Sequence, residues 1–86
     1  MKILYASAFE RRYRKLSLEL RKQVDRAIEI FIANPFDPKL RNHKLSGAKK
    51  TVRSISAGFD LRILYKEIDE HRIVLLVAVG THEDVY

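Results

Sequence analysis

Residues 73–79 read IVLLVAV, an apolar segment that decides how the rest of the chain is arranged. A strand that is apolar on both faces belongs in the middle of a sheet, because an exposed edge of this kind would aggregate. The segment is far shorter than the roughly 20 residues that span a membrane. The sequence therefore predicts a central β-strand over Arg72 to Val79.

Two further strands are predicted upstream of this segment, over Thr51 to Ser56 and Phe59 to Glu67. Ala57-Gly58 lies between them and suits a tight hairpin turn. Asp69-Glu70 then falls in the turn before the central strand. The three strands are expected to form an antiparallel meander.

The segment from residue 17 to residue 33 has the pattern of an amphipathic helix. Ser17 is suited to cap its start, and Asn34-Pro35 ends it, because the residue before proline avoids the α region. A shorter helix is predicted from the capping-box sequence Ser7-Ala8-Phe9-Glu10 to about Lys15. The apolar residues of the longer helix recur at three- and four-residue intervals: Leu20, Val24, Ala27, Ile28, Phe31 and Ile32.

The order of elements is thus a strand over Lys2 to Ala6, a helical hairpin and three strands. It predicts a single α+β domain over residues 1–86, with a small four-stranded sheet whose one face is covered by the helices. At this size nothing remains to cover the other face, which is expected to be open to solvent or to a partner.

Composition narrows the classes of function. The 86 residues suffice for one domain, and they include no cysteine, which excludes disulfides and thiolate metal sites. Three histidines without clustered spacing give no reason to expect a metal or another cofactor. No signal peptide is visible at the start, so a cytoplasmic location is expected.

The net charge of +6 is unevenly placed along the chain. Cations crowd the segment from Pro38 to Lys66, where Asp60 is the one acid, and such a stretch attracts polyanions. A nucleic acid, an acidic protein, both in turn, or a merely solubilising surface would each fit this pattern. The cations are Lys39, Arg41, Lys44, Lys49, Lys50, Arg53, Arg62 and Lys66.

The polar face of the second predicted strand carries Asp60, Arg62 and Lys66. If the hairpin is centred on Ala57-Gly58, Arg53 lies directly opposite Arg62 on the open face. Like charges placed opposite each other cost about 0.2–1 kcal/mol. Either an anion sits between the two guanidinium groups, or Asp60 screens them.

The C-terminal segment places two proton-transferring side chains four residues apart. Gly80 is expected to let the chain leave the central strand sharply. A single helical turn would then bring His82 and Tyr86 to one side. On these residues alone the pair is either catalytic or ordinary surface decoration, and His43 is more simply a loop histidine.

Three segments together resemble the RelE/ParE superfamily of bacterial toxins from type II toxin–antitoxin systems. The first is HKLSG at residues 43–47. The second is the predicted hairpin, with Arg53 on one strand and DLRILYK at residues 60–66 on the next. The third is VGTHEDVY at residues 79–86. The resemblance covers essentially the whole chain and is closest to the RelE/YafQ branch of mRNA interferases. It implies a RelE-like fold and a ribosome-dependent endoribonuclease. Such an enzyme cuts messenger RNA in the A site by metal-free attack of a 2′-hydroxyl on the adjacent phosphate.

The resemblance also implies roles for individual residues. His82 would act as general acid or base, and Tyr86 as base or stacking platform. Asp60 would orient or tune one of the other catalytic side chains. His43 matches the histidine that precedes the loop of YafQ-like toxins. The expected phosphate-binding residues are Arg62, Arg53 and Lys44, to which the basic stretch adds Lys49, Lys50 and Lys66.

Two positions depart from the YafQ-like pattern: Ser56 replaces a histidine and Leu61 replaces an aromatic residue. A ParE-like inhibitor of gyrase without catalysis, or an inactive antitoxin-binding module, therefore stays an alternative. A cognate antitoxin with an acidic and apolar segment is expected as partner, beside the ribosome and messenger RNA. The sequence leaves a homodimer and a heterotetramer with the antitoxin both open.

Overall fold

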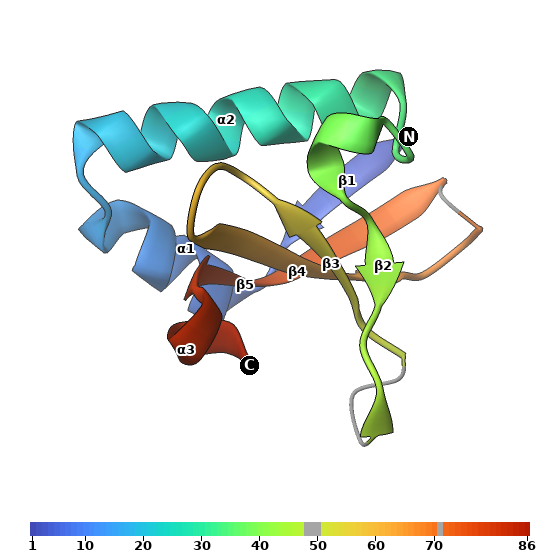
Figure 1. Cartoon of the computed structure of the whole chain (residues 1–86). Helices are drawn as coiled ribbons and strands as arrows, with labels where there is room; N and C mark the ends of the chain where they lie inside the picture. The colour runs from blue at the N-terminus through green and yellow to red at the C-terminus, as the bar shows by residue number, and fades with distance from the viewer. Residues whose placement is uncertain (48–50, 71) are drawn as a thin grey trace.

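The computed structural model describes residues 1–47, 51–70 and 72–86, in an α+β arrangement. One long helix lies above a twisted sheet, a shorter helix lies at the left-hand end of the sheet, and a third, shorter still, lies below it (Figure 1). The elements are β1 (Lys2–Tyr5), α1 (Ser7–Lys15), α2 (Leu18–Ala33), the 3₁₀ turn η1 (Pro38–Leu40), β2 (His43–Lys44), β3 (Arg53–Ser56), β4 (Leu61–Glu67), β5 (Ile73–Thr81) and α3 (His82–Val85).

The sheet has five strands in the order β1-β5-β4-β3-β2, so the predicted central position of the IVLLVAV strand is confirmed. The expected count of four strands is wrong, because His43 and Lys44 pair with β3 and add a strand at one edge. The sheet is also mixed. β1 runs parallel to β5, since the two helices between β1 and the meander carry the chain back over the sheet.

The helices begin and end close to where the sequence predicts. The Ser17 side chain accepts a hydrogen bond from the Leu20 amide at 3.2 Å, and α2 stops before Asn34, as expected. The predicted capping box at the start of α1 is wrong. Ala6 is the N-cap there without a side-chain bond, and Ser7 already lies within the helix.

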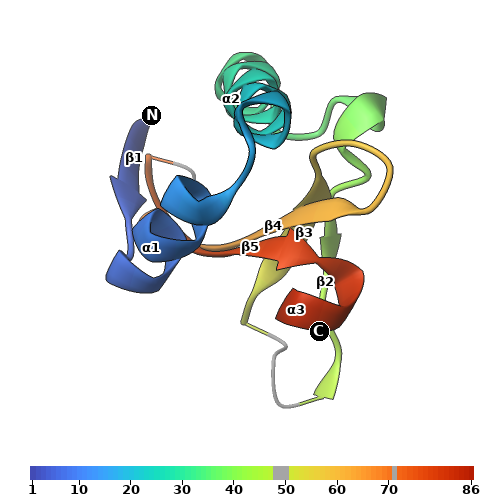
Figure 2. The ribbon, with the colours of Figure 1, turned by 90° about the vertical axis from the view of Figure 1, so that its left-hand side faces the viewer.

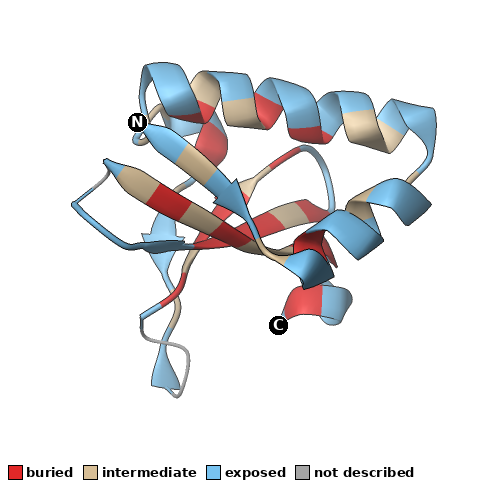
Figure 3. Cartoon of the chain, turned by 180° about the vertical axis from the view of Figure 1, so that it is seen from behind, coloured by how far each residue is buried: buried red, intermediate tan, exposed pale blue. Residues whose placement is uncertain are grey.

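The main core lies between α1, α2 and the face of the sheet that carries Ile63 and Tyr65, which is the upper face (Figure 3). The opposite face, which carries Arg62 and Leu64, is the lower face. Phe31 of α2 meets Tyr65 of β4 edge to face, with ring centroids 4.8 Å apart. The Tyr65 hydroxyl accepts a hydrogen bond from Asn42 at 2.7 Å. Burial raises the pKa of this phenol. Asn42 also accepts a hydrogen bond from Arg53 Nε at 2.8 Å, which ties β3 to the segment before β2.

The β3–β4 register differs from the predicted one by three residues. Arg53 pairs with Tyr65 and Ser56 pairs with Arg62, so the predicted Arg53–Arg62 pair does not form. The turn is longer than Ala57-Gly58, and it is closed by a bond from the Ala57 amide to the Leu61 carbonyl. A shift by an odd number of residues moves side chains to the opposite face, so Arg53 faces α2 and not the lower face.

The lower face of the sheet is not fully open, contrary to expectation. The α3 turn packs on it, on the side opposite to α2 (Figure 2). Val85 of α3 is 7 % exposed and meets Leu64 of β4 and Val52, which form a second small apolar cluster. A bulge in β5 supports this packing, because Val77 and Ala78 both join the cluster.

Candidate active site

The α3 turn carries the two residues at the centre of the candidate site. The Thr81 hydroxyl accepts a bond from the Asp84 amide at 3.3 Å, and Asp84 Oδ2 accepts one from the Thr81 amide at 3.1 Å. This reciprocal capping box starts a helical turn directly at the end of β5. The His82 and Tyr86 rings then meet edge to face, with centroids 4.3 Å apart. The predicted single turn that brings these side chains together is confirmed.

Asp84 ties this turn to α1 as well as to β5. Arg12 Nη2 lies 3.4 Å from Asp84 Oδ1. Hydrogen bonding with the Thr81 backbone amide, then with the Thr81 side chain, and finally the charge of Arg12 lower the pKa of the Asp84 carboxyl. The ionised carboxylate is therefore the form that holds the turn.

Gly80 has a different role from the predicted one. It lies within β5 and is buried, so the chain does not turn there. A Cβ at this position would stand 2.7 Å from Asp84 Cβ and 3.0 Å from Asp84 Oδ2. The missing side chain is what lets Asp84 lie close over the strand.

The pH dependence of the turn follows from Asp84. Because the carboxyl pKa is lower in the folded state than its ordinary value of 3.8, the contribution of Asp84 is complete above that pH. It is lost as the pH falls through the lower folded value. Asp84→Ala is expected to release α3 already at neutral pH, seen by NMR as loss of the shift that the Tyr86 ring induces in the His82 ring protons. Glu83→Ala, one residue away and exposed, is the control, and equal loss in both variants would contradict this role of Asp84.

Tyr86 connects the turn to β3 and, through it, to His43. The Tyr86 hydroxyl is hydrogen bonded to the Ser54 hydroxyl, which is buried on the lower face of β3. His43 pairs directly with Ser54 across β2 and β3, and directly paired residues share a face. The structure therefore brings His43, Tyr86 and His82 to the lower face of the sheet, around Ser54.

His43 has a defined tautomer in this arrangement. Its Nδ1 lies 2.9 Å from the Arg41 carbonyl oxygen. A carbonyl oxygen only accepts, so Nδ1 carries the proton in the neutral ring and Nε2 is left able to take one.

Among the predicted phosphate ligands that the structure describes, Arg62 alone lies on the lower face near this end of the sheet. It pairs with Gly80 on β5 and with Ser56 on β3. Its Nη1 lies 3.4 Å from Ser56 Oγ and 3.3 Å from the Gly58 carbonyl, so the guanidinium turns toward the hairpin.

The other predicted cations are placed elsewhere. Arg53 faces α2, donates to Asn42 and lies over the Phe36 ring with its Cζ 5.4 Å from the centroid. Lys44 pairs with Arg53 and shares that face. Lys66 lies on the lower face but four residues along β4 from Arg62, about 13 Å away at the usual rise of a strand. Lys49 and Lys50 lie outside the described residues.

Asp60 lies in the turn before β4 and not in a strand as predicted. It borders a cavity of about 230 Å³ together with residues of α2 and with Thr81. Leu61 and Thr81 are the last pair of the β4–β5 ladder, so Asp60 and His82 leave the sheet at the same end. The structure thus puts Asp60 beside α2, at the end of the sheet where α3 begins.

Sequence reasoning missed the basic residues of α1. A cavity of about 310 Å³ between α1 and α3 is lined by Arg11, Arg12 and Lys15 on one side and by Asp84 and Val85 on the other. The run RRYRK at residues 11–15 was the available signal. Its proximity to Asp84 and Val85 could not be foreseen, because it depends on α3 folding under the sheet.

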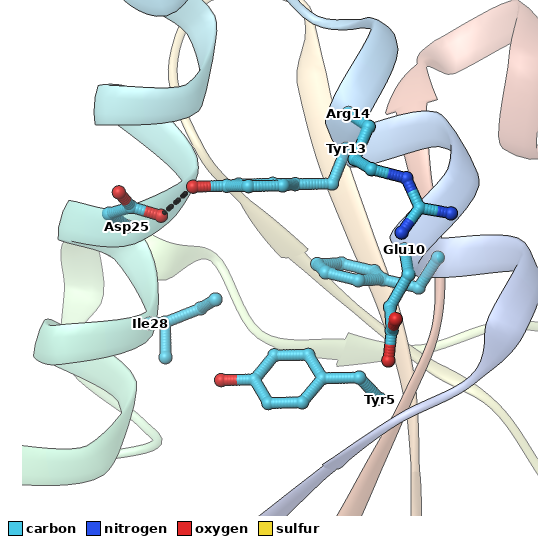
Figure 4. A pocket seen from close by; sticks show the side chains of 7 residues that line it. Tyr5, Glu10, Tyr13, Arg14, Asp25 and Ile28 are labelled. Carbon is cyan, nitrogen blue, oxygen red and sulfur yellow. Dashed lines mark hydrogen bonds between the residues drawn. The ribbon is translucent and has the colours of Figure 1, made fainter.

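The groove between α1 and α2 is a different kind of surface (Figure 4). It has a volume of about 330 Å³, and the ring of Tyr13 crosses it to donate to Asp25 Oδ1 at 2.7 Å. This bond raises the pKa of Tyr13. The lining residues come from β1, α1 and α2, on the side of the sheet away from His82: Tyr5, Phe9, Glu10, Tyr13, Arg14, Asp25 and Ile28.

Neither a metal-binding cluster nor a membrane-spanning helix is found among the described residues. Over residues 1–47, 51–70 and 72–86, no three His, Cys, Asp or Glu side chains gather where they could hold a metal ion. None of the helices in this part of the chain is long and apolar enough to cross a membrane.

Comparison with known proteins agrees with the fold and gives the family. Similar solved structures include a YoeB/ParE toxin from Agrobacterium tumefaciens, at 14 % identity and a TM-score of 0.80, covering 95 % of this chain and 99 % of that one. YafQ from E. coli strain BL21(DE3) is 20 % identical with a TM-score of 0.78, covering 99 % and 97 %. The E. coli DinJ-YafQ complex gives 20 % identity and a TM-score of 0.68, covering 99 % and 97 %. No curated protein sequence matches. A family model described as the bacterial toxin of type II toxin-antitoxin system, YafQ, matches residues 1–86, and the chain therefore belongs to the YafQ family of toxins.

Proposed function

We propose that this toxin is a ribosome-dependent endoribonuclease, which cleaves messenger RNA by attack of a 2′-hydroxyl on the adjacent phosphate. The observation that carries the proposal is the contact between His82 and Tyr86, on a turn that is docked against the lower face of the sheet. His43 and Arg62 share that face. Family membership supports the same class of activity.

Such a reaction needs a base for the 2′ proton, an acid for the leaving 5′ oxygen, and positive charge on the phosphorane between them. The free Nε2 of His43 suits the base, because the Arg41 carbonyl keeps the proton on Nδ1. His82, exposed at the start of α3, suits the acid. Arg62 supplies positive charge from β4.

Tyr86 positions His82 in this scheme. The Tyr86 hydroxyl is hydrogen bonded to Ser54, and the Tyr86 ring packs edge to face with the imidazole of His82. His82 therefore has a defined neighbour on one side. The ring is 38 % exposed, and its free surface can stack on a base of the message. A bound RNA must be single stranded here, as is a codon in the ribosomal A site.

A cognate antitoxin is proposed as the partner that silences the toxin, because the similar YafQ structure is also solved as a complex with DinJ. Three cations of α1 line a cavity with α3, namely Arg11, Arg12 and Lys15, and Arg62 of β4 pairs with Gly80, two residues before α3 begins. An antitoxin segment with acidic residues would neutralise them and cover the site. A ribosomal target implies a cytoplasmic location.

To test this proposal, the purified chain is added to a translating extract, and the 5′ ends of the cleavage products of the message are mapped by primer extension. Cleavage is expected with translating ribosomes and is expected to be absent when the same naked message is incubated with the toxin. Intact messages together with gyrase-dependent DNA breaks would overturn the proposal in favour of a gyrase inhibitor.

A further inference from the structure

A second basic cavity lies at the tip of the β3–β4 hairpin and shares Arg62 with the site described above. Its volume is about 450 Å³. Three of its six lining residues are cations, and none is acidic. The lining residues are Lys39, Arg41, Ser56, Gly58, Phe59 and Arg62.

Phe59 is the unusual member of this set. Its side chain is 100 % exposed, so it contributes nothing to either apolar cluster. Proteins that bind single-stranded nucleic acids combine an exposed aromatic ring, on which a base stacks, with cations that contact the phosphates. No packing reason within the described residues accounts for an aromatic side chain at this position.

The turn that presents Phe59 is fixed by its neighbours. Gly58 has φ 134°, and a Cβ there would collide with the Gln23 side chain of α2. Arg62 Nη1 donates to the Gly58 carbonyl at 3.3 Å and to the Leu61 carbonyl at 3.1 Å. These two bonds tie the Arg62 guanidinium to the backbone of the turn that carries Phe59.

We propose that this cavity binds one nucleotide of single-stranded RNA next to the nucleotide that is cut. The base stacks on Phe59, and the phosphate contacts Lys39 and Arg41. Arg62 joins the two sites, because it lines this cavity and pairs with Gly80, two residues before His82. The proposal rests on the proposed ribonuclease function and extends it with a binding site for the flanking nucleotide.

An acidic peptide is the competing occupant of a basic cavity. The nucleotide is favoured because Phe59 is the one large apolar side chain among the lining residues, and it is a flat ring. A peptide segment that binds through alternating acidic and apolar residues would need a continued row of apolar contacts.

The experiment is an NMR titration of the ¹⁵N-labelled chain with adenosine 5′-monophosphate and, separately, with inorganic phosphate. The mononucleotide is expected to shift the amides of Gly58, Phe59 and Arg62. Phe59→Ala is expected to weaken mononucleotide binding about tenfold, the usual effect of losing one stacked base, and to leave phosphate binding unchanged. Ile68→Ala, another exposed apolar residue in a turn, is the matched control and should bind both ligands as the wild type does.

Three results would overturn the inference: shifts confined to α3, equal binding of the mononucleotide by Phe59→Ala and the wild type, or shifts of these amides by a glutamate-rich peptide but not by the mononucleotide. The assay contains no ribosome and no cleavage step. Failure of the ribonuclease proposal, seen as an uncut message, is therefore distinguishable from failure of this one. His82→Ala is expected to bind the mononucleotide normally.

Discussion

Replacing His82 with alanine is expected to lower message cleavage by about 10²- to 10⁴-fold, the usual contribution of a general acid or base. The side chain is exposed and meets the Tyr86 ring, so its removal takes away a proton carrier without opening the core. The free energy of unfolding is expected to change by less than about 0.5 kcal/mol. The measurement compares cleavage rates in a translating extract with urea unfolding of the same preparations.

The matched control for His82 is Glu83→Ala, which changes the next residue of α3 and is expected to retain most of the activity. Tyr86→Phe separates positioning from chemistry, because it keeps the ring against His82 and removes the bond to Ser54. Cleavage by His82→Ala at the wild-type rate would show that the reacting groups lie elsewhere.

Replacing Phe31 with alanine is expected to lower the free energy of unfolding by about 3–5 kcal/mol. Phe31 is 1 % exposed and fills the space between α2 and the Tyr65 ring, so alanine leaves a cavity that a rigid helix and sheet cannot close. A domain of this size has a total stability of roughly 4–13 kcal/mol, so the loss is a large part of it. Urea unfolding followed by far-UV circular dichroism gives the number.

Phe59→Ala is the control for that measurement. The same substitution at a fully exposed position is expected to change stability by less than about 0.5 kcal/mol. An equal effect at both positions would mean that the described core is not the one that stabilises the chain.

The elements that the sequence predicted correctly are those with local causes. The apolar run of β5 has no place except the middle of a sheet, and the Ser17 cap and Asn34-Pro35 bound α2 from within a few residues. The contact between His82 and Tyr86 is local too, since one helical turn suffices to form it. These features needed no knowledge of the tertiary structure.

The pairing of β3 with β4 had no such local determinant. Gly58 suggested a two-residue turn, whereas the turn closes around it and the strands slide by three residues. Arg53 consequently faces α2, where Asn42 and Phe36 receive it. Placing an arginine on the correct face required a register that only the packing of the core fixes.

The contacts that hold the site in place were also out of reach of the sequence. Arg12 meets Asp84 across most of the chain, and Ser54 meets Tyr86 across 32 residues. Neither pair has a characteristic spacing. The place of Gly80 is similar, because its need for a missing side chain depends on Asp84 packing above it.

The most direct test of the proposed chemistry uses a message with a single 2′-O-methyl group at a nucleotide that the toxin cuts during translation. Attack by the 2′-hydroxyl predicts that cleavage at this nucleotide disappears, while cuts at unmodified nucleotides of the same message continue. Undiminished cleavage at the methylated nucleotide would contradict the account, since the nucleophile would then come from outside the message.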